Sequence, residues 1–145
     1  MRDGLSNVQL SRGANQTLSG DTPNASRAFD MQGFNAAAFF MSTNTNTVAG
    51  TGGFTIKLQH SDTLVGTDFA DVPAAQVNGT APISESNDDD DLILPGGLSY
   101  VGAKRYVRAV ITGTTNTNAV AIVWCLRSKP HRAPVAPVGA SLATT

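Results

Sequence analysis

The sequence contains very few of the residues from which helical or disulfide-bonded proteins are built. It has one glutamate and only three lysines, so two of the strongest surface helix formers are almost missing, and we expect neither a helical bundle nor a coiled coil. The single cysteine, Cys125, has no intramolecular partner for a disulfide and lies in an apolar run, where we expect a small core residue. Stability must therefore come from burial of a hydrophobic core.

Charge is also scarce. Charged residues make up 14% of the 145 residues and the formal net charge is −1, whereas the chain holds 10 Asn, 11 Ser and 16 Thr. A nearly neutral chain lacks the positive excess that binds phosphates, so we expect no direct contact with nucleic acid. The longest apolar run, residues 119–126, is too short to cross a bilayer, and no signal-peptide pattern opens the chain. We expect a protein made in the cytoplasm that does not enter a membrane.

Groups that carry out chemistry are few. The two histidines, His60 and His131, lie in no motif that pairs a nucleophile with a base, and no spacing of cysteine and histidine predicts a zinc site. The run of Asp88, Asp89, Asp90 and Asp91 lacks the alternating spacing of a calcium loop. This run is a solvated loop, an ionic contact with a partner, or a cation site. We expect no enzyme, no cofactor and no metal.

Short segments with strand periodicity dominate the chain. Residues 54–60 alternate between apolar and polar with period two, as do residues 105–111. Residues 34–41 predict a buried strand. Residues 119–126 are apolar on both faces and predict a central strand covered from two sides, with Trp124 in the core.

Polar segments rich in Gly, Thr and Asn separate these strands. Residues 42–53 and 112–118 predict two hairpin loops. The fold class that follows is all-β: an antiparallel β-sandwich or a jelly-roll-like single domain. We expect residues 1–25 to form an N-terminal arm or edge strand, residues 26–127 the sandwich, and residues 128–145 a proline-rich C-terminal tail.

Several segments in order resemble a known family. The segments are 30–37 (DMQGFNAA), 54–62 (FTIKLQHSD), 68–72 (DFADV), 100–108 (YVGAKRYVR) and 129–134 (KPHRAP). Together they resemble small structural proteins encoded in the head modules of tailed bacteriophages, over most of the chain from about residue 30 to residue 134. The motifs are structural rather than catalytic.

The resemblance implies a virion protein on the capsid surface that decorates or cements the shell. Its partners would be the major capsid protein and neighbouring copies of itself, and a trimer would suit the threefold junctions of the shell. We expect the contacts to come from both chain ends and the acidic run: Arg2, Leu5, Val8, Leu10, Arg12, Asp88, Asp89, Asp90, Asp91, Arg127, Lys129, His131 and Arg132. The alternatives are a head-to-tail connector or tail-associated protein, a carbohydrate-binding module of a host-recognition fibre, and a small hydrolase.

Overall fold

The computed structural model describes residues 7–48, 54–79, 83–85, 98–113 and 117–130 of the chain. Within these ranges every strand pairs antiparallel with its neighbours, and the only helices are two single turns of 3-10 helix, η1 (Gly66–Asp68) and η2 (Ala74–Gln76). The expectation of an all-β chain is confirmed.

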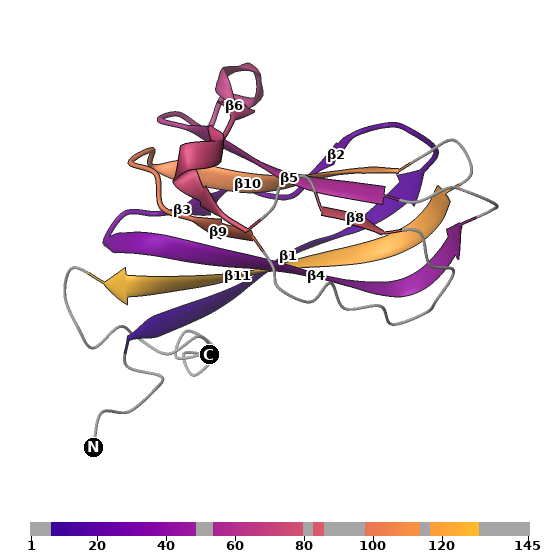
Figure 1. Cartoon of the computed structure of the whole chain (residues 1–145), viewed down its shortest axis with the longest axis horizontal. Coiled ribbons are helices and arrows are strands. Elements are labelled where there is room, and N and C mark those ends of the chain that lie inside the picture. The colour runs from indigo at the N-terminus through magenta and orange to yellow at the C-terminus, as the bar shows by residue number, and fades with distance from the viewer. Residues whose placement is uncertain (1–6, 49–53, 80–82, 86–97, 114–116, 131–145) are drawn as a thin grey trace, which may run out of the picture.

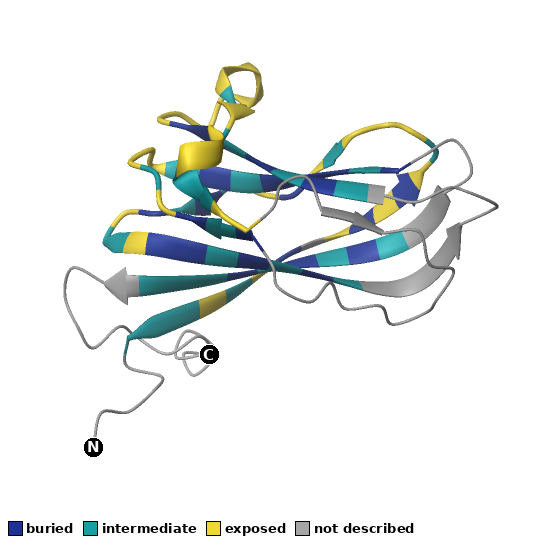
Figure 2. Cartoon of the chain, in the orientation of Figure 1, coloured by how far each residue is buried: buried dark blue, intermediate teal, exposed yellow. Residues whose placement is uncertain are grey.

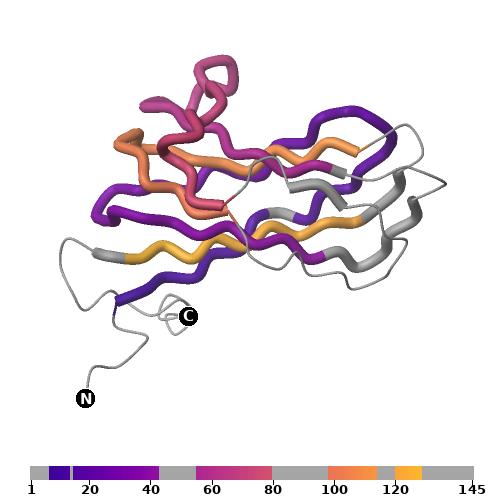
Figure 3. The backbone as a smooth tube through the Cα atoms, in the orientation of Figure 1, coloured from indigo at the N-terminus to yellow at the C-terminus, as the bar shows by residue number. Residues whose placement is uncertain are grey.

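Sheet A contains the three longest strands of the described chain. Its order is β1 (Val8–Ser19), β11 (Thr117–Pro130), β4 (Phe34–Val48), β9 (Leu98–Tyr100) and β7 (Val77–Asn78). Because β11 lies between β1 and β4, a strand from the end of the chain joins the strand that begins it. Figure 3 shows these three strands running side by side over much of their length.

Sheet B is centred on β10 (Tyr106–Gly113) and β5 (Phe54–Ser61), which pair along their whole length. The short strands β2 (Asn24–Ala25) and β3 (Phe29–Asp30) lie against β10. On the other side, β6 (Ala70–Asp71) and β8 (Ile83–Glu85) pair with β5.

The two sheets stack as the two layers of a sandwich, with the buried residues between them (Figures 1 and 2). The antiparallel β-sandwich expected from the sequence is therefore confirmed. Its core consists of Leu18, Phe29, Met31, Ala37, Phe39, Met41, Ile56, Leu58, Leu98, Tyr100, Val107, Ala109, Ile111, Ala121, Val123 and Cys125. Cys125 is fully buried, as predicted.

The period-two pattern decides which side chains enter this core. In β5, Ile56 and Leu58 are both 2% exposed, while Thr55, Lys57 and Gln59 between them are half-buried. Successive residues of a strand point to opposite faces of the sheet, so one row of apolar side chains packs against the other sheet while the second row faces outward. Strand β10 behaves in the same way, except that its second row also contains a buried residue, Val110.

A β-bulge in β1 reverses its inward face partway along the strand. The pairing with β11 moves from Arg12 opposite Trp124 to Asn15 opposite Ile122, so β1 holds one residue more than its partner. Gly13 lies at the bulge, where a Cβ atom would come within 3.1 Å of the Val123 carbonyl oxygen. Beyond the bulge Leu18 is fully buried, whereas Leu10 before it is 44% exposed.

Two of the predicted loops differ from the structure. Residues 42–48 continue β4 and residues 117–118 begin β11, because threonine is favourable in strands and the two segments pair with each other. Neither connection closes a hairpin: β4 and β11 lie in sheet A, while β5 and β10 lie in sheet B. The chain crosses between layers at both places, and loop composition does not indicate which sheet the next strand joins.

Residues before and after the expected sandwich of residues 26–127 also belong to the two sheets. Of the two alternatives for the N-terminal segment, the structure has an edge strand, since β1 is the outermost strand of sheet A. At the other end β11 runs to Pro130, so the first residues of the expected tail belong to a strand.

Candidate interaction surface

The outer face of sheet A, which points away from the core, carries an apolar strip built from three strands. Cross-strand pairing places Leu10, Leu126 and Ala38 in one row, and Arg12, Trp124 and Phe40 in the next. We call the outward-facing apolar residues of these rows, with the adjacent Ile122, the outer strip: Leu10, Ala38, Phe40, Ile122, Trp124 and Leu126. Leu10 is exposed and the other five are half-buried.

Trp124 lies at the centre of this strip, and the expectation that it belongs to the core is wrong. Its indole N–H donates a hydrogen bond of 3.2 Å to the Ser42 hydroxyl on β4. The Arg12 guanidinium carbon lies 5.9 Å from its ring centroid, and Arg12 also donates a hydrogen bond to the Asn15 side chain. The ring is therefore held in one orientation against the sheet with part of its surface in solvent.

The prediction that residues 119–126 form a strand covered from two sides is half right. Strand β11 is central in its sheet, and its inward residues Ala121 and Val123 are fully buried. Its outward residues meet solvent and one another instead of a third layer of the described chain. An apolar face on a strand does not reveal whether the same chain or another molecule covers it.

Strand β1 presents a second feature of the same surface, a free hydrogen-bonding edge. No described strand pairs with the side of β1 that faces away from β11. The 12 residues of β1 therefore offer backbone N–H and C=O groups to an extended segment from outside. Three of the predicted contact residues lie on this strand: Val8, Leu10 and Arg12.

Arg127, by contrast, is used inside the sandwich. Its guanidinium donates hydrogen bonds to the Asp30 carbonyl oxygen (2.6 Å) and to the Ser11 hydroxyl (3.0 Å), and lies 5.0 Å from the ring centroid of Phe34. One side chain of β11 thereby connects β1 in its own sheet to β3 in the other sheet. This arginine ties the two layers together.

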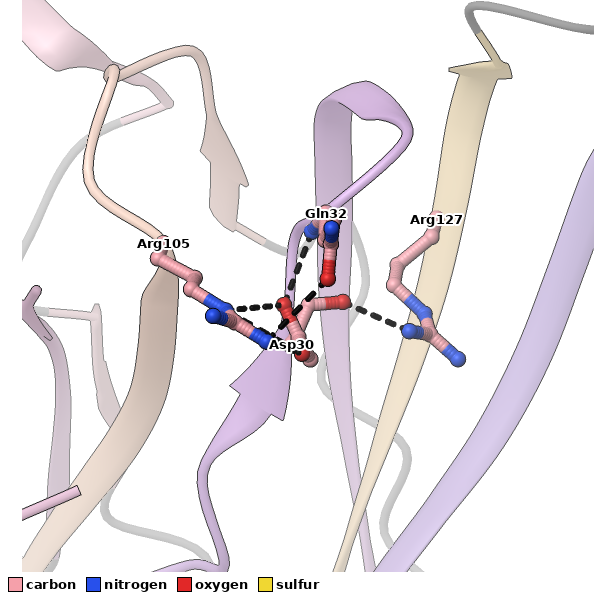
Figure 4. A network of polar contacts seen from close by, with 4 residues as sticks. All are labelled: Asp30, Gln32, Arg105 and Arg127. Carbon is pink, nitrogen blue, oxygen red and sulfur yellow. Dashed lines mark hydrogen bonds and ion pairs between the residues drawn. The ribbon is translucent and has the colours of Figure 1, made fainter. Parts of the chain in front are cut away.

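Figure 4 shows the polar network into which Arg127 reaches. The Asp30 carboxylate accepts a hydrogen bond of 3.0 Å from Arg105 and another of 2.9 Å from the Gln32 backbone N–H. Burial raises the pKa of Asp30, but the hydrogen bonds from Arg105 and Gln32 and the nearby arginine charges outweigh it, so the pKa is below its usual value. An open cleft of about 490 Å³ beside this network is lined by Gln32, Asn35 and Arg105 among others.

A second polar cluster, around His60, joins β5 of sheet B to β9 of sheet A. Its Nδ1 is 3.1 Å from the Tyr100 hydroxyl, and Lys104 forms an ion pair of 2.5 Å with Asp62 beside a cleft of about 310 Å³. Burial, followed by the positive charge of Lys104, lowers the pKa of His60. His60 is hydrogen-bonded to a buried tyrosine rather than aimed at a nucleophile, and Asp62 is already neutralised by a lysine.

The remaining predicted contact residues lie outside the described residues: Arg2, Leu5, Asp88, Asp89, Asp90, Asp91, His131 and Arg132. Lys129 is the last residue but one of β11. The structure thus places Val8, Leu10 and Arg12 together on the outer face of sheet A. The Arg127 side chain lies on the opposite face, toward sheet B.

Sequence reasoning missed Phe40 and Leu126 as surface residues. One signal was available for Phe40: Phe39 and Phe40 are adjacent in a strand, so they must point to opposite faces, and only one of them can enter the core between two sheets. Phe39 is 1% exposed and Phe40 is half-buried on the outer face.

In the described part of the chain, no group of three or more His, Cys, Asp or Glu side chains is placed to hold a metal ion. The same residues include no helix long and apolar enough to cross a membrane.

Comparison with known proteins adds a distant structural likeness. No protein-family model and no curated protein matches the chain. Among solved structures, a Bacillus endospore appendage from a family of disulfide-linked pili covers 90% of this chain and 95% of its own, with a TM-score of 0.46 and 15% sequence identity. A likeness of this size carries no argument about function.

Proposed function

We propose that this protein is a structural component of a bacteriophage virion that decorates or cements the capsid shell, and that it acts by binding rather than by catalysis. The resemblance of its sequence segments to phage head proteins supports this role. The observation that carries the proposal is the free edge of β1, a long strand with a neighbouring apolar face. Such an edge is a ready template for an extended segment of another protein.

Binding at this edge would proceed by strand addition. An extended segment of the major capsid protein, or of a neighbouring copy, would pair with β1 before the bulge, over residues 8–12, through backbone hydrogen bonds. Each such contact is small, but a shell presents the same site many times, so weak contacts add up over the particle. A site built mainly from backbone groups needs few charged side chains, in keeping with the low charge of this chain.

The copy number of the protein tests its place in the virion. Quantitative mass spectrometry of purified particles gives the ratio of this chain to the major shell protein. We expect a ratio near one or a simple fraction that corresponds to hundreds of copies. About a dozen copies would instead assign the protein to the neck or tail, as a head-to-tail connector or tail-associated protein. Its absence from the particle would overturn the structural role.

Two proline variants test the edge of β1. Neighbouring residues of a strand point their N–H groups to opposite sides, so of Val8 and Gln9 one faces β11 and the other faces the free edge. Val8→Pro and Gln9→Pro should therefore differ. The variant in which proline replaces the residue whose N–H faces the free edge keeps the stability of the wild type and loses binding to shells stripped of this protein.

The matched controls are Val8→Ala and Gln9→Ala, which alter the same side chains without removing an N–H group. Both should bind shells as the wild type does. If both proline variants were stable and bound shells with undiminished affinity, strand addition at this end of β1 would be ruled out, while the copy-number result would stand separately.

A further inference from the structure

The outer strip is an apolar surface that no further layer of the described chain covers, although the Arg12 guanidinium lies over part of the Trp124 ring. Three strands spaced about 4.8 Å apart and about six residues in length give a face of roughly 15 by 20 Å, or about 300 Å². A stable interface between two folded partners buries about 800 Å² on each side. The strip is therefore too small to hold two sandwiches together face to face, but it matches the footprint of a single extended chain segment.

A segment of this size, residues 131–145, continues from the strand that carries the centre of the strip. Residues 131–145 follow directly after Pro130, the last residue of β11, and β11 carries the centre of the strip. Trp124 lies six residues before Pro130, a distance of about 20 Å along the strand. After a turn of two or three residues, about seven residues in polyproline II conformation, which rises about 3.1 Å per residue, cover that distance in the reverse direction.

The composition of residues 131–145 fits this surface. The segment is HRAPVAPVGASLATT, with no acidic residue and with Val135 and Val138 in an Ala-Pro-Val-Ala-Pro-Val run. Pro134 and Pro137 are three positions apart, so in a strand their missing N–H groups would lie on opposite sides, and one would interrupt any ladder. Proline-containing segments of this kind dock on faces lined by aromatic rings.

We propose that residues 133–139 fold back over the outer strip of the same chain and pack their prolines and valines against Trp124, Phe40 and Leu126. The indole ring is already fixed by its hydrogen bond to Ser42, so it forms a preorganised platform. Docking covers the apolar face of sheet A and leaves the edge of β1 free. This inference does not depend on the proposed role in a virion.

The single tryptophan of the chain provides the assay, because all tryptophan fluorescence comes from the centre of the strip. The test compares acrylamide quenching of the full-length wild type with that of the double variant Val135→Asp, Val138→Asp. A charge on each valine opposes docking on an apolar surface. We expect the quenching constant to rise about twofold, since the indole side that the segment covers becomes accessible.

The matched control is the double variant Ser141→Asp, Thr144→Asp, which adds the same charge to the same segment outside the docking residues. It should be quenched like the wild type. None of these four positions lies in the described sandwich, so the fold is not put at risk. Equal quenching of all three proteins would overturn the proposal.

Dilution separates docking within one chain from exchange between copies. An intramolecular contact gives the same wild-type quenching constant over about a hundredfold range of protein concentration, whereas a contact between copies weakens on dilution by mass action. A quenching constant that rises on dilution would assign the strip to a neighbouring copy's segment and would overturn the intramolecular placement.

Discussion

Replacing Tyr100 with phenylalanine removes one oxygen atom at a point where three parts of the chain meet. The hydroxyl accepts a hydrogen bond of 3.0 Å from the backbone N–H of Lys104, and it lies 3.1 Å from His60 Nδ1 on β5. Since the hydroxyl accepts from Lys104, its own proton is available to His60, and we assign His60 as neutral with its proton on Nε2. The tyrosine ring itself is fully buried.

The cost of Tyr100→Phe follows from these two contacts. The Lys104 N–H is near the surface, where water replaces the lost partner, but His60 is 9% exposed and its Nδ1 would be left without one. An ordinary hydrogen bond contributes about 1 kcal/mol and an unsatisfied buried acceptor costs about 1–3 kcal/mol, so we expect a loss of about 2 kcal/mol. For a domain of this size that corresponds to a fall in Tm of about 6–8 °C.

Urea denaturation followed by tryptophan fluorescence measures this loss, with an unchanged m-value as the sign that the folded state is otherwise intact. Tyr106→Phe is the matched control, because Tyr106 is the only other tyrosine and is half-buried at the start of β10. It should change stability by less than about 0.5 kcal/mol. If Tyr100→Phe were equally neutral, the hydroxyl would not connect these segments and the reasoning would fail.

Three further predictions concern the same corner of the fold and the acidic run. Burial and the charge of Lys104 lower the pKa of His60, so the unfolded chain binds a proton at His60 more readily than the folded chain does. The free energy of unfolding should therefore fall as the pH drops below about 6.5. Urea titrations at about pH 7.5 and about pH 5.5 measure this fall, and His60→Gln should remove the part of it that His60 causes. Gly102→Ala should destabilise by about 2–3 kcal/mol in the same assay, because its Cβ would overlap the buried Tyr100 ring. Changing Asp88, Asp89, Asp90 and Asp91 to Asn should make shell binding less dependent on salt; an unchanged dependence would argue against an ionic contact there.

Much of the fold was predictable because strand periodicity is a local property. Ile56 and Leu58 are apolar at alternate positions, and any strand with that pattern turns them to the same face, whatever its neighbours. The scarcity of helix formers and the burial of Cys125 follow from composition and from its apolar neighbours in the same direct way.

The surface was harder to predict, because it depends on which strands become neighbours. Trp124 lies in a run that is apolar on both faces, and the sequence does not indicate that only one of those faces meets another layer. The bulge at Gly13 has the same effect on β1, where Leu10 and Leu18 share a parity in the sequence and end on opposite faces.

The sequence by itself determined the fold class, the inward rows of β5 and β10 and the lack of a recognisable catalytic motif, since each of these rests on residues close together in the chain. Only the tertiary structure decided that β1 is an edge strand beside β11, that Arg127 joins the layers, and that Trp124, Phe40 and Leu126 form one strip. Each of those features is a contact between residues far apart in the chain. Pairing across such distances depends on the summed packing of the whole sandwich, which no local pattern encodes.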